Sequence, residues 1–253
     1  MNLQYISDIH LEFYDLSKIP KLLYKIIPTS KICVLAGDIG YPFQKTYQVF
    51  IIGLSKKFEH IFMIHGNHEY YQLGKNKGKS IEEIIIQTNF IIDSNHLDNV
   101  HFLNNSFYDI DNFRFVGSVL WSELTNHNYL TNDIENITEL SISKINETHL
   151  QSKVFINQIL EQSLNENKSV VMITHYLPSY LLIHSKYFNF RNYNQCFASN
   201  CHELIKKPIV CWIFGHTHSP TETFINDILF VANPLGYPGE NKKLNFNKTI
   251  NIL

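Results

Sequence analysis

Five short clusters of histidine, aspartate and asparagine occur along this chain, each at the end of a run of apolar residues. In chain order they are Asp8-Ile9-His10, Gly37-Asp38, Gly66-Asn67-His68-Glu69, His175 and Gly215-His216-Thr217-His218. Imidazole, carboxylate and amide groups bind Mn, Fe or Zn in hydrolytic centres, and a set without thiolates disfavours a closed structural zinc site. The clusters therefore predict a metal centre, if the fold brings them together.

The apolar runs before the clusters predict the strands that would bring them together. These strands are expected at residues 3–7, 31–36, 61–64, 170–173 and 209–214. Ligands of open α/β sheets bind beyond the carboxyl ends of the strands, so we expect the five clusters to share one crevice. In an extended chain, residues two apart point the same way. We therefore expect both members of the Asp-x-His pair, and of the His-x-His pair, to face one site.

Each cluster taken alone has a structural explanation. A single Asp-x-His or Gly-Asp after a strand is more often a turn. Gly-Asn-His-Glu also fits a helix start, in which Asn67 caps the helix and Glu69 favours its dipole. We expect Glu69 to be an orienting partner or a helix-start residue rather than a reactant. What favours a shared site is the recurrence of the pattern after five apolar runs.

Composition narrows the class of protein. The 253 residues are 44% hydrophobic and 17% charged, which is typical of a folded globular chain. The longest apolar runs, such as Ile209–Phe214, are far shorter than the roughly 20 residues of a membrane span, and the first residues lack the features of a signal peptide. A net charge of −2 makes an extended nucleic acid an unfavourable partner, whereas a small phosphate ester remains compatible because metal ions supply positive charge.

The four cysteines indicate the compartment. Cys33 and Cys211 lie within apolar runs, and Cys196 and Cys201 lack the spacing of a zinc or redox site. A chain of this size does not need a disulfide for stability. We therefore expect reduced thiols and a cytoplasmic location.

The organisation of the chain predicts one α/β domain spanning residues 1–253. No repeat or linker divides it, and the polar stretch at 126–146 is interpreted as an insertion or loop. Further helices are expected at 20–27, at 42–54 with Pro42 in the first turn, from a capping box of Ser80 with Glu83, and at 150–164. Further strands are expected at 101–103, 107–110, 113–119, 221–225 and 228–232. Strand–helix alternation early and hairpin-like strands late predict two packed sheets flanked by helices.

Taken together, the five clusters resemble the motifs of the calcineurin-like metallophosphoesterase superfamily. The resemblance covers the chain from Ser7 to at least Glu240. Trp121 after Gly117, and the stretch 233–238, resemble a compact single-domain branch of that superfamily. This branch usually has an arginine where the chain has Leu235, which puts an anion contact from that position in doubt. The resemblance implies a four-layer αββα sandwich of two mixed sheets flanked by helices.

The resemblance also implies two divalent metal ions, with Mn favoured over Fe or Zn. One ion would be held by Asp8, His10, Asp38 and His218. The other would be held by Asp38, Asn67, His175 and His216. Asp38 would bridge the pair, and His68 would be the catalytic residue that protonates the leaving oxygen or stabilises the transition state.

The expected function is a dinuclear-metal-dependent phosphohydrolase that acts by metal-activated hydroxide, with phosphodiesters of a small or nucleotide-like substrate favoured. Two cations about 3.5–4 Å apart lower the pKa of a bridging water and clamp the phosphoryl oxygens. The alternatives are a phosphomonoesterase, a protein Ser/Thr phosphatase, whose Asn-His block has an arginine-rich neighbourhood that is missing here, and a DNA nuclease. A non-catalytic scaffold of the same fold is a further alternative, although such proteins usually lose ligands.

Four side chains are candidates for substrate binding, because aromatic walls and one cation suit a nucleotide-like ester. They are Tyr41, Trp121, Tyr176 and Arg191. The alternative is that Trp121 packs in the core and that Arg191 lies on the surface.

Overall fold

The computed structural model describes residues 1–125 and 131–252, without the side chains of residues 190–192, and its strands form two sheets. The first sheet has the order β11-β1-β2-β3-β4. Its strands are β1 (Asn2–Ile6), β2 (Ile32–Ala36), β3 (His60–Ile64), β4 (Val100–Phe102) and β11 (Thr249–Asn251). The first four strands run parallel, and β11 pairs with β1 in the antiparallel sense.

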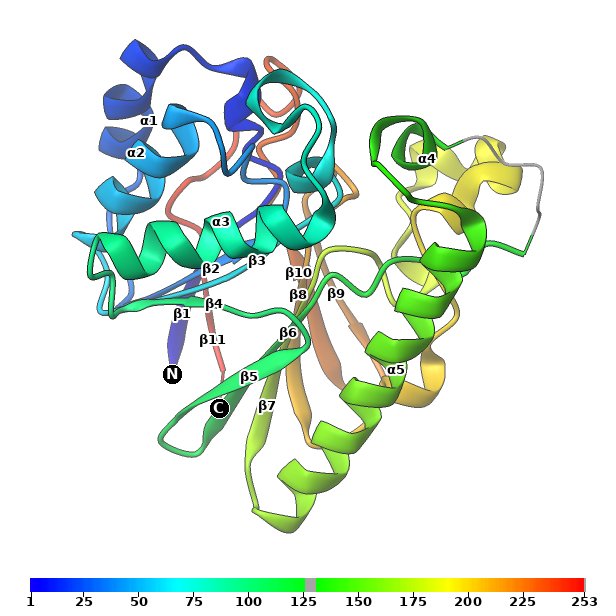
Figure 1. Ribbon diagram of the computed structural model, residues 1–253. Coiled ribbons are helices and arrows are strands. Elements are labelled where there is room, and N and C mark those ends of the chain that lie inside the picture. The colour runs from blue at the N-terminus through cyan, green and yellow to red at the C-terminus, as the bar shows by residue number, and fades with distance from the viewer. Residues whose placement is uncertain (126–130, 253) are drawn as a thin grey trace.

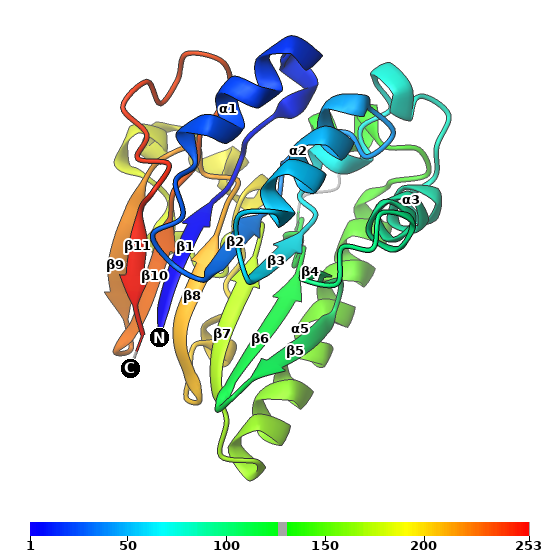
Figure 2. The same cartoon turned by 90° about the vertical axis from the view of Figure 1, so that its left-hand side faces the viewer.

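The second sheet has the order β5-β6-β7-β8-β10-β9. Its strands are β5 (Ser106–Ile110), β6 (Phe113–Ser118), β7 (Ser169–Thr174), β8 (Ile209–Phe214), β9 (Thr221–Ile225) and β10 (Ile228–Ala232). The four central strands are parallel, and β5 and β9 are antiparallel edges. Figure 2 shows the parallel strands of both sheets running in one general direction, so that their carboxyl ends lie toward the same side of the molecule.

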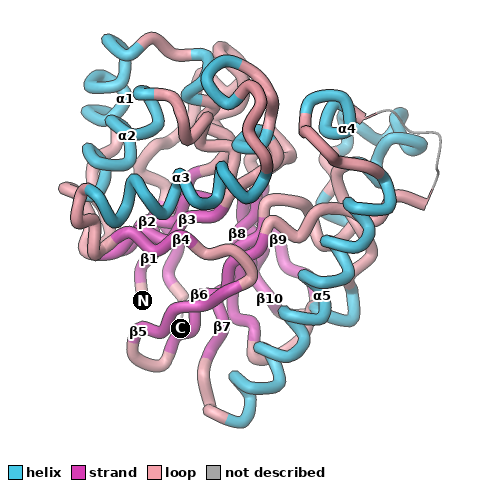
Figure 3. The backbone as a smooth tube through the Cα atoms, in the orientation of Figure 1, coloured by secondary structure: helices cyan, strands magenta, loops and turns pink. Residues whose placement is uncertain are grey.

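Helices cover the outer face of each sheet (Figure 1), with the strands between them (Figure 3). The first sheet is covered by α1 (Ile19–Lys25), α2 (Lys45–Ser55) and α3 (Ile81–Ser94). The second is covered by the long α5 (Ile142–Asn165), and the short α4 (Asn132–Asn136) lies near the amino end of α5. The four layers confirm the predicted αββα sandwich of two mixed sheets.

The alternation of side chains along the strands explains why each strand is apolar throughout. In β2, Val34 and Ala36 face the second sheet, whereas Cys33 and Leu35 pack under the helices. Because both faces are covered, the strand has no solvated side and needs no polar alternation. Between the sheets, the rings of Phe62 and Phe115 stack with centroids 4.0 Å apart. This packing fixes one sheet against the other and thereby positions the loops at their carboxyl ends.

Most predicted elements are confirmed, and the differences lie at helix starts. The capping box of Ser80 and Glu83 is present at the start of α3. By contrast, α2 begins at Lys45 rather than in the turn of Pro42. The helix expected from residue 150 begins eight residues earlier, where the Ser141 hydroxyl caps it by accepting from the Lys144 amide. Of the stretch 126–146, interpreted as an insertion or loop with some helix, residues 126–130 lie outside the described residues, and α4 and the first turns of α5 occupy much of the remainder.

Within the described residues, no helix combines the length and the apolarity that crossing a bilayer requires. All four cysteines are unpaired.

Candidate metal centre

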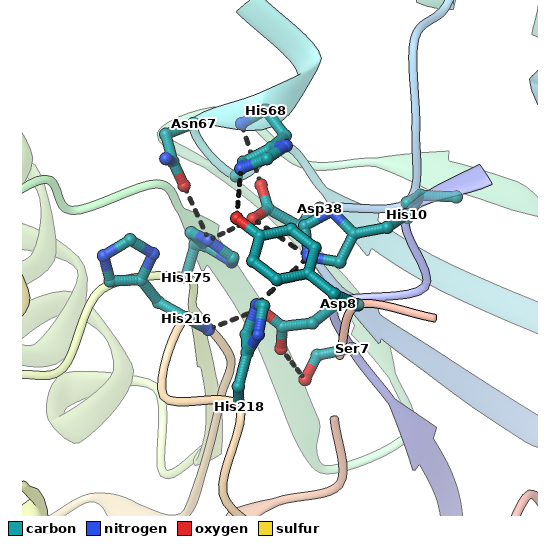
Figure 4. A network of polar contacts seen from close by, with 12 residues as sticks. Ser7, Asp8, His10, Asp38, Asn67, His68, His175, His216 and His218 are labelled. Carbon is teal, nitrogen blue, oxygen red and sulfur yellow. Dashed lines mark hydrogen bonds and ion pairs between the residues drawn. The ribbon is translucent and has the colours of Figure 1, made fainter. Parts of the chain in front are cut away.

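The five predicted clusters converge at the carboxyl ends of β1, β2, β3, β7 and β8, where their side chains point toward one another (Figure 4). Three groups of three or four side chains each place their ligand atoms within 4.8 Å of one another. The first group is Asp8, His10, Asp38 and His218, the second is Asp38, His175 and His216, and the third is His10, Glu12 and His68. The predicted sharing of Asp38 by two groups therefore corresponds to the arrangement of the side chains.

In the first group, an imidazole nitrogen of His10 faces an imidazole nitrogen of His218. His10 Nε2 lies 3.1 Å from His218 Nε2. His10 Nδ1 lies 2.9 Å from a Glu12 oxygen, and His218 Nδ1 lies 2.7 Å from a Glu240 oxygen. A neutral imidazole has one N–H, so two rings that donate from Nδ1 both present lone pairs from Nε2. Facing lone pairs are repulsive, and a cation between them removes that repulsion.

The second group contains a buried nitrogen without a partner. His216 Nε2 is buried and has no hydrogen-bond partner among the described residues. An unsatisfied buried polar atom costs about 1–3 kcal/mol, so its retention calls for an explanation. His175 Nε2 lies 3.3 Å from Asp38 Oδ2 and 3.1 Å from Asn67 Oδ1, which brings a carboxylate, an amide oxygen and an imidazole together. This donor set fits a divalent transition metal.

The loops that carry these side chains are not extended, which corrects the expectation about residues two apart. Five residues of the centre have left-handed backbones with φ between 46° and 65°: Asp8, His10, Asp38, His216 and His218. Non-glycine residues in this region carry strain of order 1–3 kcal/mol each and persist where the surroundings enforce them. Here the loops after β1 and β2 bind each other, since the His10 amide donates to the Asp38 carbonyl at 2.9 Å.

Two glycines leave room for the centre. Gly66 lies so close to Asp38 and His175 that a Cβ atom there would overlap both side chains. Gly37 has φ of 84°, and a Cβ atom at this position would lie 2.5 Å from His175 Nδ1. A larger residue at either position would displace His175.

The charged side chains of the centre shift one another's pKa values. Although burial alone would raise it, the neighbouring His175, His68 and His10 hold the pKa of Asp38 well below its usual range. Burial likewise disfavours the charged form of His68, but Asp38 and a hydrogen bond to Glu12 outweigh it and raise the pKa of His68 to about 9. The centre therefore favours an ionised carboxylate surrounded by positive charge.

Glu69 has the orienting role expected of it. Its buried carboxylate accepts from the backbone amides of Ile39 at 2.6 Å, Gly66 at 2.7 Å and Asp38 at 3.1 Å. Burial, followed by the Asp38 charge, raises the pKa of Glu69. Glu69 thus ties the loop after β2 to the loop after β3.

Asp133 was not predicted to belong to the site. It lies in α4, within the segment interpreted as an insertion, and its buried carboxylate accepts from Asn67 Nδ2 at 2.7 Å and from the Tyr71 hydroxyl at 2.9 Å. The Tyr176 hydroxyl donates to its other oxygen at 2.8 Å. By holding the amide nitrogen, Asp133 turns the amide oxygen of Asn67 toward His175. Sequence spacing offers no signal for this contact, because 66 residues separate the two partners.

The segment 233–238 reaches the site, as the resemblance implied. The amide of Leu235 donates to the Ser7 carbonyl at 3.0 Å, and the amide of Gly236 donates to the Asp8 carbonyl at 2.9 Å. This docking brings the Tyr237 hydroxyl within 3.2 Å of His68 Nε2. The Leu235 side chain packs against the apolar core under the helices of the first sheet.

A cavity of about 530 Å³ opens beside the centre. Its polar lining includes Asp38, Asn67, His68, His216, His218, Asp133, Tyr237 and Glu240, and its apolar and aromatic lining includes Leu177, Ile183, Tyr187, Tyr193 and Phe197. None of the described lining residues is a lysine or an arginine.

The candidate substrate-binding residues lie mostly behind this cavity. Tyr41, Trp121 and Tyr176 are buried and are not among its lining residues. Trp121 packs against Tyr176 with ring centroids 5.4 Å apart, which corresponds to the core-packing alternative. The Arg191 side chain lies outside the described part of the structure.

Comparison with known proteins agrees with this fold and with the sequence motifs. A family profile described as calcineurin-like phosphoesterase matches residues 1–220. Uncharacterized protein L509 of Acanthamoeba polyphaga mimivirus is 30% identical over 276 residues, which cover 96% of this chain and 94% of that protein.

Two solved structures show the same fold at low identity. Phosphopantetheinyl hydrolase (PptH) from Mycobacterium tuberculosis has a TM-score of 0.74 at 16% identity, covering 98% of this chain and 95% of its own. A dimetal phosphatase from Danio rerio has a TM-score of 0.53 at 13% identity, covering 92% and 86%. With the profile match spanning most of its length, this chain belongs to the calcineurin-like phosphoesterase family.

Proposed function

We propose that this protein is a dinuclear-metal-dependent phosphohydrolase that cleaves phosphodiester bonds of a small substrate. The observation that carries the proposal is the pair of donor groups that share Asp38 at the wall of a cavity. We assign Asp8, His10, Asp38 and His218 to one metal ion, and Asp38, Asn67, His175 and His216 to the other. Mn is the favoured metal, before Fe or Zn, because oxygen ligands accompany the imidazoles in both groups.

The arrangement of the donor atoms favours the binding of two cations. Nε2 of His10 lies 3.1 Å from Nε2 of His218, and the buried Nε2 of His216 has no hydrogen-bond partner among the described residues. When bound, two such cations lower the pKa of a water molecule and neutralise phosphoryl oxygens. We expect this effect to supply the larger part of the catalysis.

The chain itself supplies a proton donor. His68 Nε2 faces the cavity, while its Nδ1 lies 2.9 Å from Glu12. The raised pKa of about 9 keeps a proton on His68 at neutral pH. Bound cations would offset the Asp38 contribution to this pKa, whereas the hydrogen bond to Glu12 would remain. His68 is therefore placed to protonate the leaving oxygen.

The charge of the cavity wall favours a diester over a monoester. Asp133 and Glu240 line the cavity, and its described lining has no lysine or arginine. A phosphodiester has one negative charge, whereas a monoester near neutral pH has up to two. Each additional negative charge is unfavourable beside carboxylates. Because the four cysteines are unpaired, we also propose a reducing compartment such as the cytoplasm.

The test is metal analysis of protein purified without chelator, followed by turnover of bis(p-nitrophenyl) phosphate and p-nitrophenyl phosphate with added Mn, Fe or Zn. We expect about two metal ions per chain and at least about tenfold higher kcat/KM for the diester, a difference of about 1.4 kcal/mol. Faster turnover of the monoester would reassign the protein as a phosphomonoesterase. Failure to bind any metal, together with no turnover of either ester, would refute the proposal.

A further inference from the structure

Glu12 joins a candidate metal ligand to the candidate proton donor. Its Oε1 atom lies 2.9 Å from His10 Nδ1 and 2.9 Å from His68 Nδ1. The side chain is only 4% exposed, and its other oxygen is buried without a hydrogen-bond partner among the described residues. One carboxylate oxygen thus accepts from two imidazole rings. Because its position is four residues after Asp8 and two after His10, Glu12 extends the first cluster to Asp-x-His-x-Glu.

The orientation of the His68 ring requires a partner on its Nδ1 side. The ring stacks on Tyr71 with centroids 4.3 Å apart and an interplanar angle of 24°. Stacking fixes the plane of the ring, but it does not distinguish the ring from its 180° flip, which exchanges a nitrogen edge for a carbon edge. The contact with Glu12 makes that distinction. With Nδ1–H held by Glu12, Nε2 faces the cavity and the Tyr237 hydroxyl, 3.2 Å away.

We propose that Glu12 is a positioning residue for catalysis: its shared oxygen holds His68 so that Nε2 presents its proton to the leaving group, while it fixes His10 with Nε2 toward the candidate metal site. This inference rests on the proposed phosphohydrolase function. It assigns a role to a carboxylate that is neither in the proposed ligand set nor in contact with the cavity.

The step that depends on this orientation is cleavage of the ester bond. The oxygen of a water molecule forms a bond to phosphorus, and the water loses one proton to solvent. The bond between phosphorus and the leaving oxygen breaks, with its electron pair remaining on that oxygen. The leaving oxygen takes the proton from His68 Nε2, and solvent later returns a proton to the ring. A poor leaving group needs this proton more than a good one does.

A matched pair in the same centre separates this role from support of a ligand. Glu240 accepts from His218 Nδ1 at 2.7 Å, much as Glu12 accepts from His10. For Glu240, the structure gives no direct contact with His68, although Glu240 also lines the cavity and accepts from the Tyr237 amide at 2.8 Å. The substitution Glu240→Gln therefore tests the loss of a carboxylate behind a candidate ligand that does not itself bind the His68 ring.

The experiment compares two diesters that differ only in the leaving group, methyl p-nitrophenyl phosphate and methyl phenyl phosphate, at saturating Mn. For Glu12→Gln we expect kcat to fall about 100-fold for the phenyl ester and about 10-fold for the nitrophenyl ester, with KM within about threefold and metal content unchanged. Glu240→Gln should weaken metal binding and leave the ratio of the two rates as in the wild type. In a His68→Ala background, Glu12→Gln should lower kcat by no more than about threefold, because the two residues act as one unit.

Three results would overturn the inference. One is an equal loss of both activities in Glu12→Gln in step with metal content, which would make Glu12 a support of His10 alone. Another is full additivity of Glu12→Gln and His68→Ala. The third is a wild-type protein that binds Mn but hydrolyses neither ester. This result would refute the proposed function itself, and the wild-type activity is therefore measured before any variant is made. If Glu12→Gln does not fold, Glu12→Asp keeps the charge but withdraws it by one methylene, and the same ranking of the two esters is expected.

Discussion

Two polar clusters in this molecule, each built around a buried charged side chain, are arranged in opposite ways. The arginine cluster consists of Arg114, Asp109, Glu166 and Ser163. Arg114 lies in β6 with a side chain only 2% exposed, and it binds Asp109 at 2.8 and 2.9 Å and Glu166 at 2.6 Å. It also contacts the Ser163 hydroxyl and the face of Phe107. Every charge in the arginine cluster has an opposite charge beside it.

The proposed metal centre, called the metal centre below, consists of the eight residues Asp8, His10, Asp38, Asn67, His68, His175, His216 and His218. Two of its imidazole nitrogens face each other, one buried nitrogen has no partner among the described residues, and five backbones are left-handed. A cluster that serves only the fold would relieve such conflicts, as the arginine cluster does. The difference indicates that the arginine cluster contributes to stability, and that the metal centre carries strain that bound cations would relieve.

The largest loss of activity is expected from substitution of Asp38, the ligand that two metal ions are proposed to share. Asp38→Asn keeps the size of the side chain but removes the charge that two cations would share. We expect kcat/KM for a diester to fall at least about 1,000-fold, or about 4 kcal/mol, and metal content to drop below two per chain. Metal analysis and steady-state kinetics measure both quantities. A variant that retains two metal ions and full activity would exclude Asp38 from the shared position.

The arginine cluster should respond in stability rather than in activity. Arg114→Ala removes a buried side chain and leaves two partly exposed carboxylates without their partner, so we expect a loss of about 1–3 kcal/mol in the free energy of unfolding, mostly from lost packing. Urea unfolding of the metal-free protein measures this loss. Turnover per folded molecule should stay within about twofold of the wild type, since Arg114 lies far along β6 from the centre. Arg114→Met, which restores apolar packing, is the control and should recover part of the loss.

The sequence was informative about the metal centre because its residues occur in short clusters after apolar strands. Asp8 with His10, or His216 with His218, can be recognised within three residues, and the strands before them follow from continuous apolar runs. The layers followed from the same runs, because strands that are apolar on both faces must be covered on both faces.

The supporting carboxylates could not be recognised in this way. Glu12, Asp133 and Glu240 occur singly, and a single carboxylate in a polar stretch is usually solvated. Asp133 lies 66 residues from the Asn67 that it orients, so only the folded chain brings them together. The left-handed backbones were also missed, because Asp and His do not signal a positive φ as glycine does. Of these residues, only Glu12 had a usable signal, its regular spacing after Asp8 and His10.

Two histidines, His65 and His216, show the same difference between satisfied and unsatisfied buried nitrogens. His65 is fully buried and satisfied, with ring nitrogens 3.1 Å from the Tyr70 hydroxyl and 2.9 Å from the Thr88 hydroxyl. Burial lowers the pKa of His65 to about 3, so the ring is neutral. We expect His65→Leu to lower the free energy of unfolding by about 1–3 kcal/mol, because the Tyr70 hydroxyl loses its partner and the Thr88 hydroxyl keeps only its bond to the Ile84 carbonyl. His216→Leu removes a buried atom that already lacks a partner, so it should leave the free energy of unfolding of the metal-free protein unchanged or raise it.

The gain in stability on addition of metal should distinguish His65→Leu from His216→Leu. Wild-type and His65→Leu protein should both gain about 2.7 kcal/mol at a metal concentration 100 times the Kd. His216→Leu should gain less than half of that amount, because one donor of the second group is missing. Thermal or urea unfolding with and without Mn gives both numbers. Equal gains in all three proteins would show that His216 is not a ligand.

The smallest effect is expected from acid acting on the arginine cluster. A hydrogen bond and charge attraction from Arg114 lower the pKa of Asp109 below its ordinary value of 3.8. The unfolded chain therefore takes up this proton first as the pH falls, so the stability that Asp109 contributes is present above about pH 4 and is lost below it. Because Asp109 is 32% exposed, we expect this contribution to stay below about 1 kcal/mol. Urea unfolding of wild-type and Asp109→Asn protein, both without metal, should show a difference at pH 6 that shrinks by pH 3. A difference that is constant across this range would mean that the charge of Asp109 adds nothing to the arginine cluster beyond the hydrogen bonds that an amide can replace.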